Sequence, residues 1–210
     1  MMRYRDKKLI IFDMDGTLVN SSLTIANAIN YVRKHLGLAP LDAGFILSKV
    51  NDHTINPAEL FYEAPAFTKE HERLFSEYYS ANHDKELVLY DGIEALLRKL
   101  KQAGKKLAVA TNAYRRSTLE SLRHLGIAEY FDEVVCYDDA GYQGKPDPKM
   151  LLMILERLGM SREEALFIGD GERDEIAAKR AGIAYIMVAW GFSDHKRAVC
   201  DIETLEKMLL

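Results

Sequence analysis

Short apolar segments that end abruptly in polar residues constrain the fold of this chain most strongly. Three of them are 9–12 before Asp13, 107–110 before Thr111, and 166–168 before Gly169. Each is continuously apolar rather than alternating, which is typical of strands buried on both faces of a parallel sheet. The stretches 133–137 and 183–188 have the same character. The sequence therefore predicts a mainly parallel, five-stranded sheet.

Helical patterns separate these predicted strands. The stretch 93–100 has one apolar helical face, which Asp91 is expected to cap at its start. The stretches 148–158 and 172–181 predict two more helices, each followed by a glycine that can end it. From about residue 87 onward, strands and helices alternate. This pattern predicts an α/β fold with a doubly wound, Rossmann-like parallel sheet.

A helical block without a convincing strand follows the first predicted strand. A stripe over 25–36 ends at Gly37, and 42–50, 57–63 and 68–79 are also helix-like. We expect residues 17–87 to form an all-helical cap domain. It would be inserted into a catalytic core of residues 1–16 and 88–210, with hinges at 17–20 and 84–90.

Composition narrows the function classes. The chain has 28 Lys and Arg against 32 Asp and Glu, a net charge of −4, which argues against a nucleic-acid or anionic-membrane partner. Its longest apolar run, 183–190, is too short to span a bilayer. Cys136 and Cys200 lie far apart and form no Cys-x-x-Cys pair, which favours a reduced, cytoplasmic protein. The size fits a monomer or weak homodimer.

Seven polar side chains are expected at the carboxyl ends of the predicted strands, where parallel α/β sheets place their active sites. They are Asp13, Asp15, Thr111, Asn112, Lys145, Asp170 and Asp174. Carboxylates brought together repel, and their pKa values rise unless a cation lies among them. A hard, oxygen-seeking cation such as Mg²⁺ is the natural partner for this group.

These residues resemble, in order along the chain, the four motifs of the haloacid dehalogenase superfamily. The stretch 13–19, Asp-Met-Asp-Gly-Thr-Leu-Val, matches the first motif, and Thr111-Asn112 resembles the second. Lys145-Pro146 resembles the third motif and Gly169-Asp170-x-x-x-Asp174 the fourth, although Gly171 stands where serine is common. The helical insert is similar to the cap of the phosphoglycolate phosphatase and β-phosphoglucomutase branch.

The resemblance implies a role for each residue. Asp13 would be the nucleophile that forms an aspartyl phosphate, and Asp15 the general acid and base. Dehalogenases of the superfamily lack the second aspartate, so Asp15 favours phosphoryl chemistry. Thr111 and the Asn112 N–H would bind the phosphoryl oxygens, and Lys145 would offset their charge.

The resemblance also implies a Mg²⁺ site. Its ligands would be a carboxylate oxygen of Asp13, the main-chain carbonyl of Asp15 and a carboxylate oxygen of Asp170. Asp174 would orient these ligands or bind the ion directly. In the cap, Lys49 lies in a polar segment with Asn51, Asp52 and His53, where it could meet an anionic leaving group.

The expected activity is a Mg²⁺-dependent phosphatase acting on a small phosphorylated metabolite, with phosphoglycolate as the first candidate. A β-phosphoglucomutase-type phosphomutase, a pyrophosphatase or a nucleotidase would use the same core residues, so only the cap separates these activities. A phosphoryl-accepting signalling module or a binding-only relative is the non-enzyme alternative. The presence of every motif residue favours an enzyme.

Overall fold

The computed structural model describes residues 4–52, 54–192 and 197–210. Within them, five parallel strands form one sheet in the order β5-β4-β1-β6-β7. They are β1 (Leu9–Phe12), β4 (Lys106–Thr111), β5 (Glu133–Cys136), β6 (Ala165–Gly169) and β7 (Ala184–Met187). The five strands predicted from the apolar runs are confirmed, with boundaries that shift by one residue.

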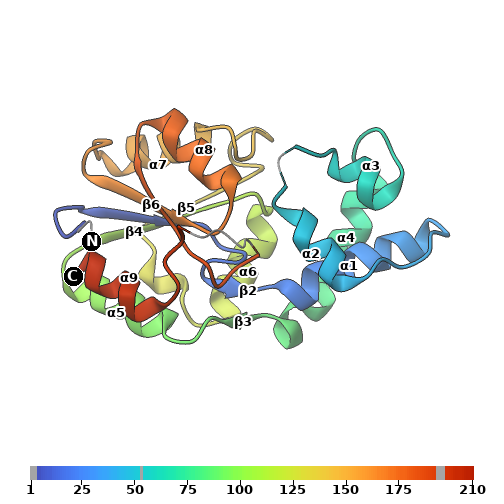
Figure 1. Ribbon diagram of the computed structural model, residues 1–210, viewed down its shortest axis with the longest axis horizontal. Coiled ribbons are helices and arrows are strands. Elements are labelled where there is room, and N and C mark those ends of the chain that lie inside the picture. Colours follow the sequence, from blue (N-terminus) through green and yellow to red (C-terminus); the bar gives the residue numbers. More distant parts are fainter. Residues whose placement is uncertain (1–3, 53, 193–196) are drawn as a thin grey trace.

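Helices cover both faces of this sheet (Figure 1). Helices α5 (Ile93–Gln102), α6 (Arg115–His124) and α9 (Ile202–Leu209) pack against one face, and α7 (Lys149–Leu158) and α8 (Glu172–Ala181) against the other. A single 3₁₀ turn, η1 (Ala128–Tyr130), precedes β5. Side chains of β1 alternate between the two cores, since Ile10 joins the first and Ile11 the second. The doubly wound arrangement expected from the sequence is therefore present.

The ends of three core helices test the capping predictions. Helices α7 and α8 end at Gly159 and Gly182, both left-handed, as predicted. The prediction that Asp91 caps α5 is wrong. The residue before α5 is Gly92, at φ 89°, and a Cβ there would lie 3.4 Å from Ile202 Cγ2 of α9. A left-handed residue at this turn moves the start of the helix past Asp91.

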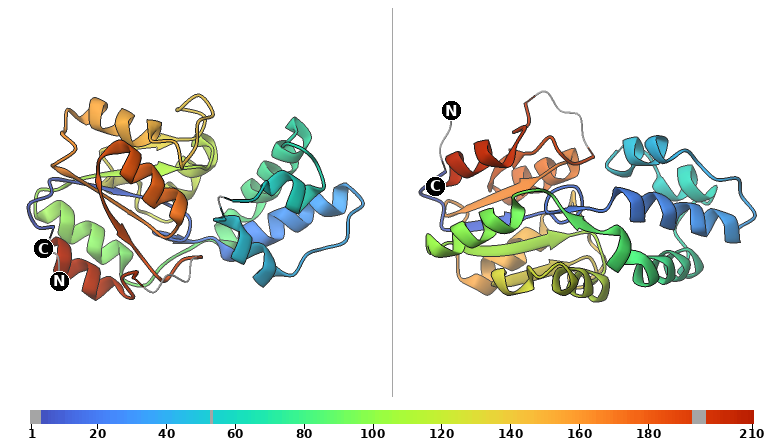
Figure 2. Two further views of the ribbon diagram at one scale, coloured as in Figure 1. Left: turned by 45° about the horizontal axis from the view of Figure 1, so that its top comes forward. Right: turned by 90° about the horizontal axis from the view of Figure 1, so that it is seen from below.

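Four helices gather at one end of the molecule, beyond the edge of the sheet (Figures 1 and 2). They are α1 (Ser22–His35), α2 (Ala43–Val50), α3 (Pro57–Tyr62) and α4 (Lys69–Glu86). Ile29, Val32, Ile46 and Phe61 form a separate small core among them. Helix α4 runs to Glu86, so the first three residues of the predicted hinge at 84–90 belong to this helix. No helix in the described ranges has the length and apolar character needed to cross a bilayer.

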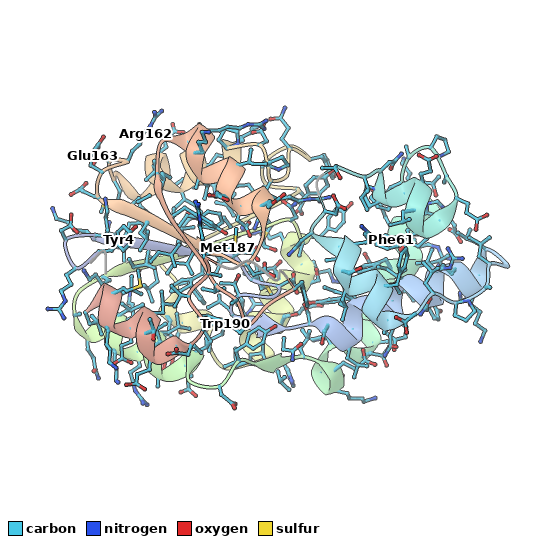
Figure 3. All side chains as sticks on the ribbon, viewed as in Figure 1. Tyr4, Phe61, Arg162, Glu163, Met187 and Trp190 are labelled. Atoms are coloured by element: carbon cyan, nitrogen blue, oxygen red, sulfur yellow. The ribbon has the colours of Figure 1, made fainter. Side chains whose placement is uncertain are left out.

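The two chain segments that join the cap helices to the sheet pair with each other. Strands β2 (Val19–Asn20) and β3 (Val88–Leu89) form a two-stranded antiparallel sheet, which the sequence pattern did not predict. Trp190, labelled in Figure 3, donates from its ring N–H to the Thr17 carbonyl oxygen at 3.0 Å. The two segments that connect the helical insert to the sheet are therefore held next to each other by the pairing of β2 with β3.

Candidate active site

The register of the sheet brings three of the predicted site residues, Asp13, Thr111 and Asp170, to the same edge of the sheet. Phe12 lies opposite Val109 of β4 and Ile168 of β6, so the residues that follow these strands emerge together. The Asp13 N–H donates to the Ile168 carbonyl oxygen at 2.8 Å, which holds Asp13 in line with β6. After β1 the chain builds β4 and β5 on one side of it and then crosses back to build β6 and β7 on the other side. Parallel sheets bind ligands at such a reversal of strand order.

A buried lysine joins two of the carboxylates. The Lys145 Nζ contacts an Asp13 oxygen and lies 2.7 Å from Asp174 Oδ1, and all three side chains are at least nine-tenths buried. Burial acts to lower the pKa of Lys145, but Asp13 and Asp174 outweigh it and raise the pKa above its ordinary value. Lys145 is therefore a fixed positive charge at the floor of the site.

Asp13, Asp170 and Asp174 form a compact acidic group. Each offers one carboxylate oxygen, and these oxygens lie within 4.8 Å of one another. Burial raises the pKa of Asp13 well above its usual range, Lys145 opposes the shift, and Asp174 and Asp170 add to it. Burial and Asp174 raise the pKa of Asp170 to about 7. A buried all-oxygen set in which Asp13 and Asp170 have raised pKa values fits a hard cation, which would favour their ionised forms.

Two glycines allow the main chain to approach this acidic group closely. A Cβ on Gly16 would lie 2.3 Å from Asp170 Oδ2, and one on Gly191 would lie 2.2 Å from the Gly16 carbonyl oxygen. Gly16 also has φ 83°, in the left-handed region that favours glycine. Only residues without a side chain fit here, which leaves main-chain oxygen beside the carboxylates.

Asp170 also receives hydrogen bonds from two other parts of the chain. Its Oδ2 accepts from the Phe192 N–H at 2.7 Å and from Asn51 Nδ2 of the cap at 3.1 Å. A Cβ on Gly171 would lie 3.1 Å from Asn51 Nδ2, so the glycine found in place of serine makes room for this cap residue. The cap therefore reaches the acidic group directly.

Asp15 stands apart from the acidic group. Burial raises its pKa, and its buried Oδ1 makes no hydrogen bond among the described residues. The neighbouring Thr17 hydroxyl donates a hydrogen bond to Asp13 Oδ2 at 3.4 Å. A carboxyl with a raised pKa and an unpaired oxygen is suited to carry a proton.

Thr111 and Asn112 lie at the end of β4, as predicted. Thr111 is buried, and its Oγ1 accepts from the Ala113 N–H at 3.1 Å. The Asn112 side chain accepts from the Lys145 N–H at 2.7 Å and donates to the Lys145 carbonyl oxygen at 3.1 Å. The sequence reasoning used only the main chain of Asn112 and did not foresee that its side chain fixes the lysine loop.

A cavity of about 570 Å³ opens between the core and the cap helices. Six of the seven predicted site residues line it: Asp13, Asp15, Thr111, Asn112, Lys145 and Asp174. Asp170 lies behind this wall, within reach of Asp13 and Asp174. Phe61, labelled in Figure 3 among the cap helices, belongs to the opposite wall.

Two further polar residues of the cavity were not assigned a role from the sequence. Asn51 was named only as part of a polar segment, and Arg173 sits at an unassigned position of the fourth motif. Arg173 Nη2 donates to the Asp52 carbonyl oxygen at 3.0 Å, while its buried Nε has no partner among the described residues. An arginine between two motif aspartates is a signal that could have found it.

The cap lysine singled out from the sequence does not line the cavity. Lys49 Nζ pairs instead with Asp52 at 3.3 Å, and helix α2 ends between these two residues, at Val50. His53 lies outside the described residues. Cys136, expected in the core, is fully buried.

Comparison with known proteins agrees with this geometry. The family described as haloacid dehalogenase-like hydrolase matches residues 10–188. The chain is 32% identical over 209 residues to a phosphoglycolate phosphatase of Chromobacterium violaceum, covering 96% of this chain and 93% of that protein. It is 33% identical over 185 residues to the phosphoglycolate phosphatase of Aquifex aeolicus, covering 88% and 86%.

Solved structures show the same fold. The crystal structure of a predicted phosphatase from Clostridium acetobutylicum has a TM-score of 0.84 and 26% identity, covering 99% of this chain and 98% of that one. The order of the motifs, the fold and the two sequence relatives all agree. This chain belongs to the haloacid dehalogenase-like hydrolase family.

Proposed function

We propose that the protein is a Mg²⁺-dependent phosphatase that hydrolyses the phosphate monoester of a small metabolite through an aspartyl phosphate. The observation that carries this proposal is the arrangement of Asp13, Lys145 and the acidic group at the floor of one cavity. A phosphate dianion repels an anionic nucleophile, so attack requires fixed positive charge and an in-line position. Lys145 supplies such a charge beside Asp13.

In the first step, an Asp13 carboxylate oxygen attacks phosphorus while the bond from phosphorus to the leaving alcohol breaks. Asp15 gives its proton to the leaving oxygen, which its raised pKa favours. In the second step, Asp15 takes a proton from water, and the water oxygen attacks phosphorus. Inorganic phosphate leaves, and the Asp13 carboxylate is restored.

The phosphoryl oxygens would lie against Thr111, the Asn112 N–H and Lys145. Thr111 and Lys145 are both buried at the cavity floor, which strengthens hydrogen bonds and charge interactions there. The side chain of Asn112 would keep Lys145 in position through its two hydrogen bonds to that residue's main chain.

The metal site would use Asp13 and Asp170, with the main-chain carbonyl of Asp15 and with Asp174 as a ligand or orienting group. An all-oxygen donor set favours Mg²⁺ over softer metals. When bound, the ion would neutralise charge on the carboxylates and the phosphoryl group. Gly16 and Gly191 supply the space that brings the main chain beside these ligands.

The relatives support phosphoglycolate as the first substrate to test. A phosphomutase of the β-phosphoglucomutase type, a pyrophosphatase or a nucleotidase would need the same core residues. A phosphoryl-accepting or binding-only protein would keep the site without turnover. We further propose that residues 17–87 act as the substrate-selecting cap, and that the protein is a cytoplasmic monomer or weak homodimer without nucleic-acid or membrane partners.

The test is release of inorganic phosphate from a panel of phosphorylated compounds with Mg²⁺, with a chelator, and with Asp13→Asn. The panel contains phosphoglycolate, pyrophosphate, sugar phosphates and nucleoside monophosphates. Turnover that requires Mg²⁺ and disappears in Asp13→Asn supports the proposal. A folded protein that releases phosphate from none of these compounds would contradict it.

A further inference from the structure

The cavity extends well beyond the space that a phosphoryl group needs. Its volume of about 570 Å³ lies within the range, about 300–1,000 Å³, of cavities that hold drug-sized ligands. The polar floor around Asp13 and Lys145 accounts for one end. A two-carbon acid such as glycolate would leave most of the remaining space unfilled, so the far walls carry information about the leaving group.

On the core side, three tyrosines form a continuous row. Tyr137 packs edge-on against Tyr114 at 5.8 Å and against Tyr142 at 5.5 Å between ring centroids. A Cβ on Gly144 would lie 3.0 Å from a Tyr137 ring carbon, so the middle ring of the row lies beside the loop that carries Lys145. Tyr114 and Tyr142 contact this middle ring.

On the cap side, a second set of rings lines the same cavity. Phe67 packs edge-on against Tyr62 at 5.8 Å, and Phe75 stacks on Tyr79 at 6.3 Å. Several of these rings fill the cap interior, but Phe67 is 50% exposed. Aromatic surface therefore faces the cavity from both sides.

Tyr142 is the most informative member of the core row. It is 63% exposed and has φ 63°, a left-handed conformation that is unfavourable for a residue with a side chain. The fold holds it there through the hydrogen bond from its N–H to the Tyr137 carbonyl oxygen at 3.0 Å. An exposed aromatic side chain kept in a strained conformation at a cavity indicates a ligand-binding role.

The cavity is lined by charges of both signs, which do not select an acidic leaving group. Lys145 is already paired with Asp13 and Asp174. Arg173 lies next to the Asp174 end of the site, and the exposed Glu72 carboxylate belongs to the cap wall. The aromatic walls themselves carry no charge, so an uncharged planar group would suit them better than a carboxylate.

Resting on the proposed phosphatase function, we infer that the leaving alcohol of the substrate carries a planar aromatic ring. The ring lies between Tyr142 and Tyr137 of the core and Phe67 of the cap, while the phosphoryl group lies at Asp13. A nucleobase and a pyridine ring share this chemistry, and substrates of both kinds distinguish them.

The experiment compares esters that differ in the ring but share a primary alcohol as leaving group. Adenosine and uridine monophosphate and pyridoxal phosphate carry a ring, whereas ribose 5-phosphate and phosphoglycolate carry none. We expect kcat/KM for at least one ring-bearing ester to exceed that for ribose 5-phosphate by about tenfold or more, as stacking of one ring predicts. The better of the two ring types identifies the source.

Variants then test the named residues. Tyr142→Ala and Phe67→Ala should each lower the ratio of kcat/KM between the best ring-bearing ester and ribose 5-phosphate by about fivefold to tenfold. Tyr142→Phe keeps the ring and should retain the ratio. Leu23→Ala removes an exposed apolar side chain outside the cavity, 55% exposed, and serves as the matched control.

The possible failures are distinguishable. If ring-free esters, phosphoglycolate included, are turned over as well as or better than ring-bearing ones, the inference is overturned while the phosphatase function stands. The same holds if Tyr142→Ala and Phe67→Ala lower all esters equally. If no ester is turned over, the proposed function fails and this inference fails with it.

Discussion

The side chain of Asn112 forms hydrogen bonds with both the main-chain N–H and the main-chain carbonyl of Lys145. Asn112 Oδ1 accepts from the Lys145 N–H at 2.7 Å, and Asn112 Nδ2 donates to the Lys145 carbonyl oxygen at 3.1 Å. Lys145 comes from a loop 33 residues away in sequence, yet its ammonium group must meet Asp13 and Asp174. The amide of Asn112 ties that loop to the end of β4.

Replacing Asn112 by Ala should therefore lower kcat/KM by about tenfold to hundredfold, because the loss of two hydrogen bonds lets Lys145 move from the carboxylates. Steady-state phosphate release measures the effect. Asn27→Ala, which removes an amide that donates to Glu86 at 3.1 Å in the cap, is the control and should change kcat/KM less than twofold, roughly. Equal losses in both variants would contradict a positioning role.

Asp15→Asn should separate leaving groups by their need for a proton. For alkyl phosphates, loss of the general acid should lower kcat about 10²- to 10⁴-fold. For p-nitrophenyl phosphate, whose leaving group departs without protonation, formation of the aspartyl phosphate should be affected much less. A rapid burst of nitrophenolate followed by slow turnover is the expected signal. Equal losses in the rate of aspartyl-phosphate formation for both esters, with no burst of nitrophenolate, would argue against an acid role.

Metal binding should depend on pH through Asp170. In the metal-free protein its pKa is raised from 3.8 to about 7, and a cation must displace that proton. Mg²⁺ affinity should therefore rise as pH increases through about 7. Calorimetric titration across this range measures the affinity, and a flat profile would contradict the assignment.

The same shift predicts how metal-free stability changes with pH. Because the folded state holds the Asp170 proton between about pH 4 and pH 7 while the unfolded state does not, its contribution to stability falls as pH rises through this window. Metal-free wild type should lose melting temperature relative to Asp170→Asn between about pH 5 and about pH 8. Added Mg²⁺ should restore it most at the higher pH. A difference that does not change with pH would contradict this reasoning.

Two glycines with similar backbones test the close approach at the acidic group. Gly16 and Gly37 have φ 83° and 74°, so alanine introduces comparable backbone strain at each, about 1–2 kcal/mol. Only at Gly16 would the new Cβ meet a carboxylate, 2.3 Å from Asp170 Oδ2, whereas nothing lies within 4 Å at Gly37. Gly16→Ala should therefore weaken Mg²⁺ binding and activity by about tenfold or more beyond Gly37→Ala. Similar metal affinities in the two variants would disprove the contact.

The sheet could be predicted closely because parallel strands that are buried on both faces appear in the sequence as short continuous apolar runs. The runs 9–12, 107–110 and 166–168 are continuously apolar and stop where the chain reaches the site, so the pattern alone located these strands. The ends of α7 and α8 were also predictable, because Gly159 and Gly182 directly follow the helical patterns. Gly92 was missed as the residue before α5 because the pattern favoured Asp91 as the cap, and the left-handed conformation of Gly92 is seen only in the structure.

The polar floor of the site was predictable and its cap side was not. Asp13 and Asp174 belong to motifs with fixed spacing, but Asn51 reaches Asp170 only through the docking of the cap on the core. Lys49, two residues earlier, looked equally suitable and pairs instead with Asp52. Lys49 lies in the last turn of helix α2 and Asn51 directly after it, and the sequence pattern does not distinguish which of the two faces the site.

The pairing of β2 with β3 has a consequence for how the molecule can be altered. Asn20 lies opposite Val88, so the two ends of the inserted helical segment are neighbours in space. A segment whose ends are already held together can change in length at little entropic cost to the remainder of the chain. Because β2 and β3 hold its two ends together, the inserted helical segment can be replaced as a unit. A graft between Asn20 and Val88 should leave the parallel sheet and its acidic group intact while replacing the wall that faces them.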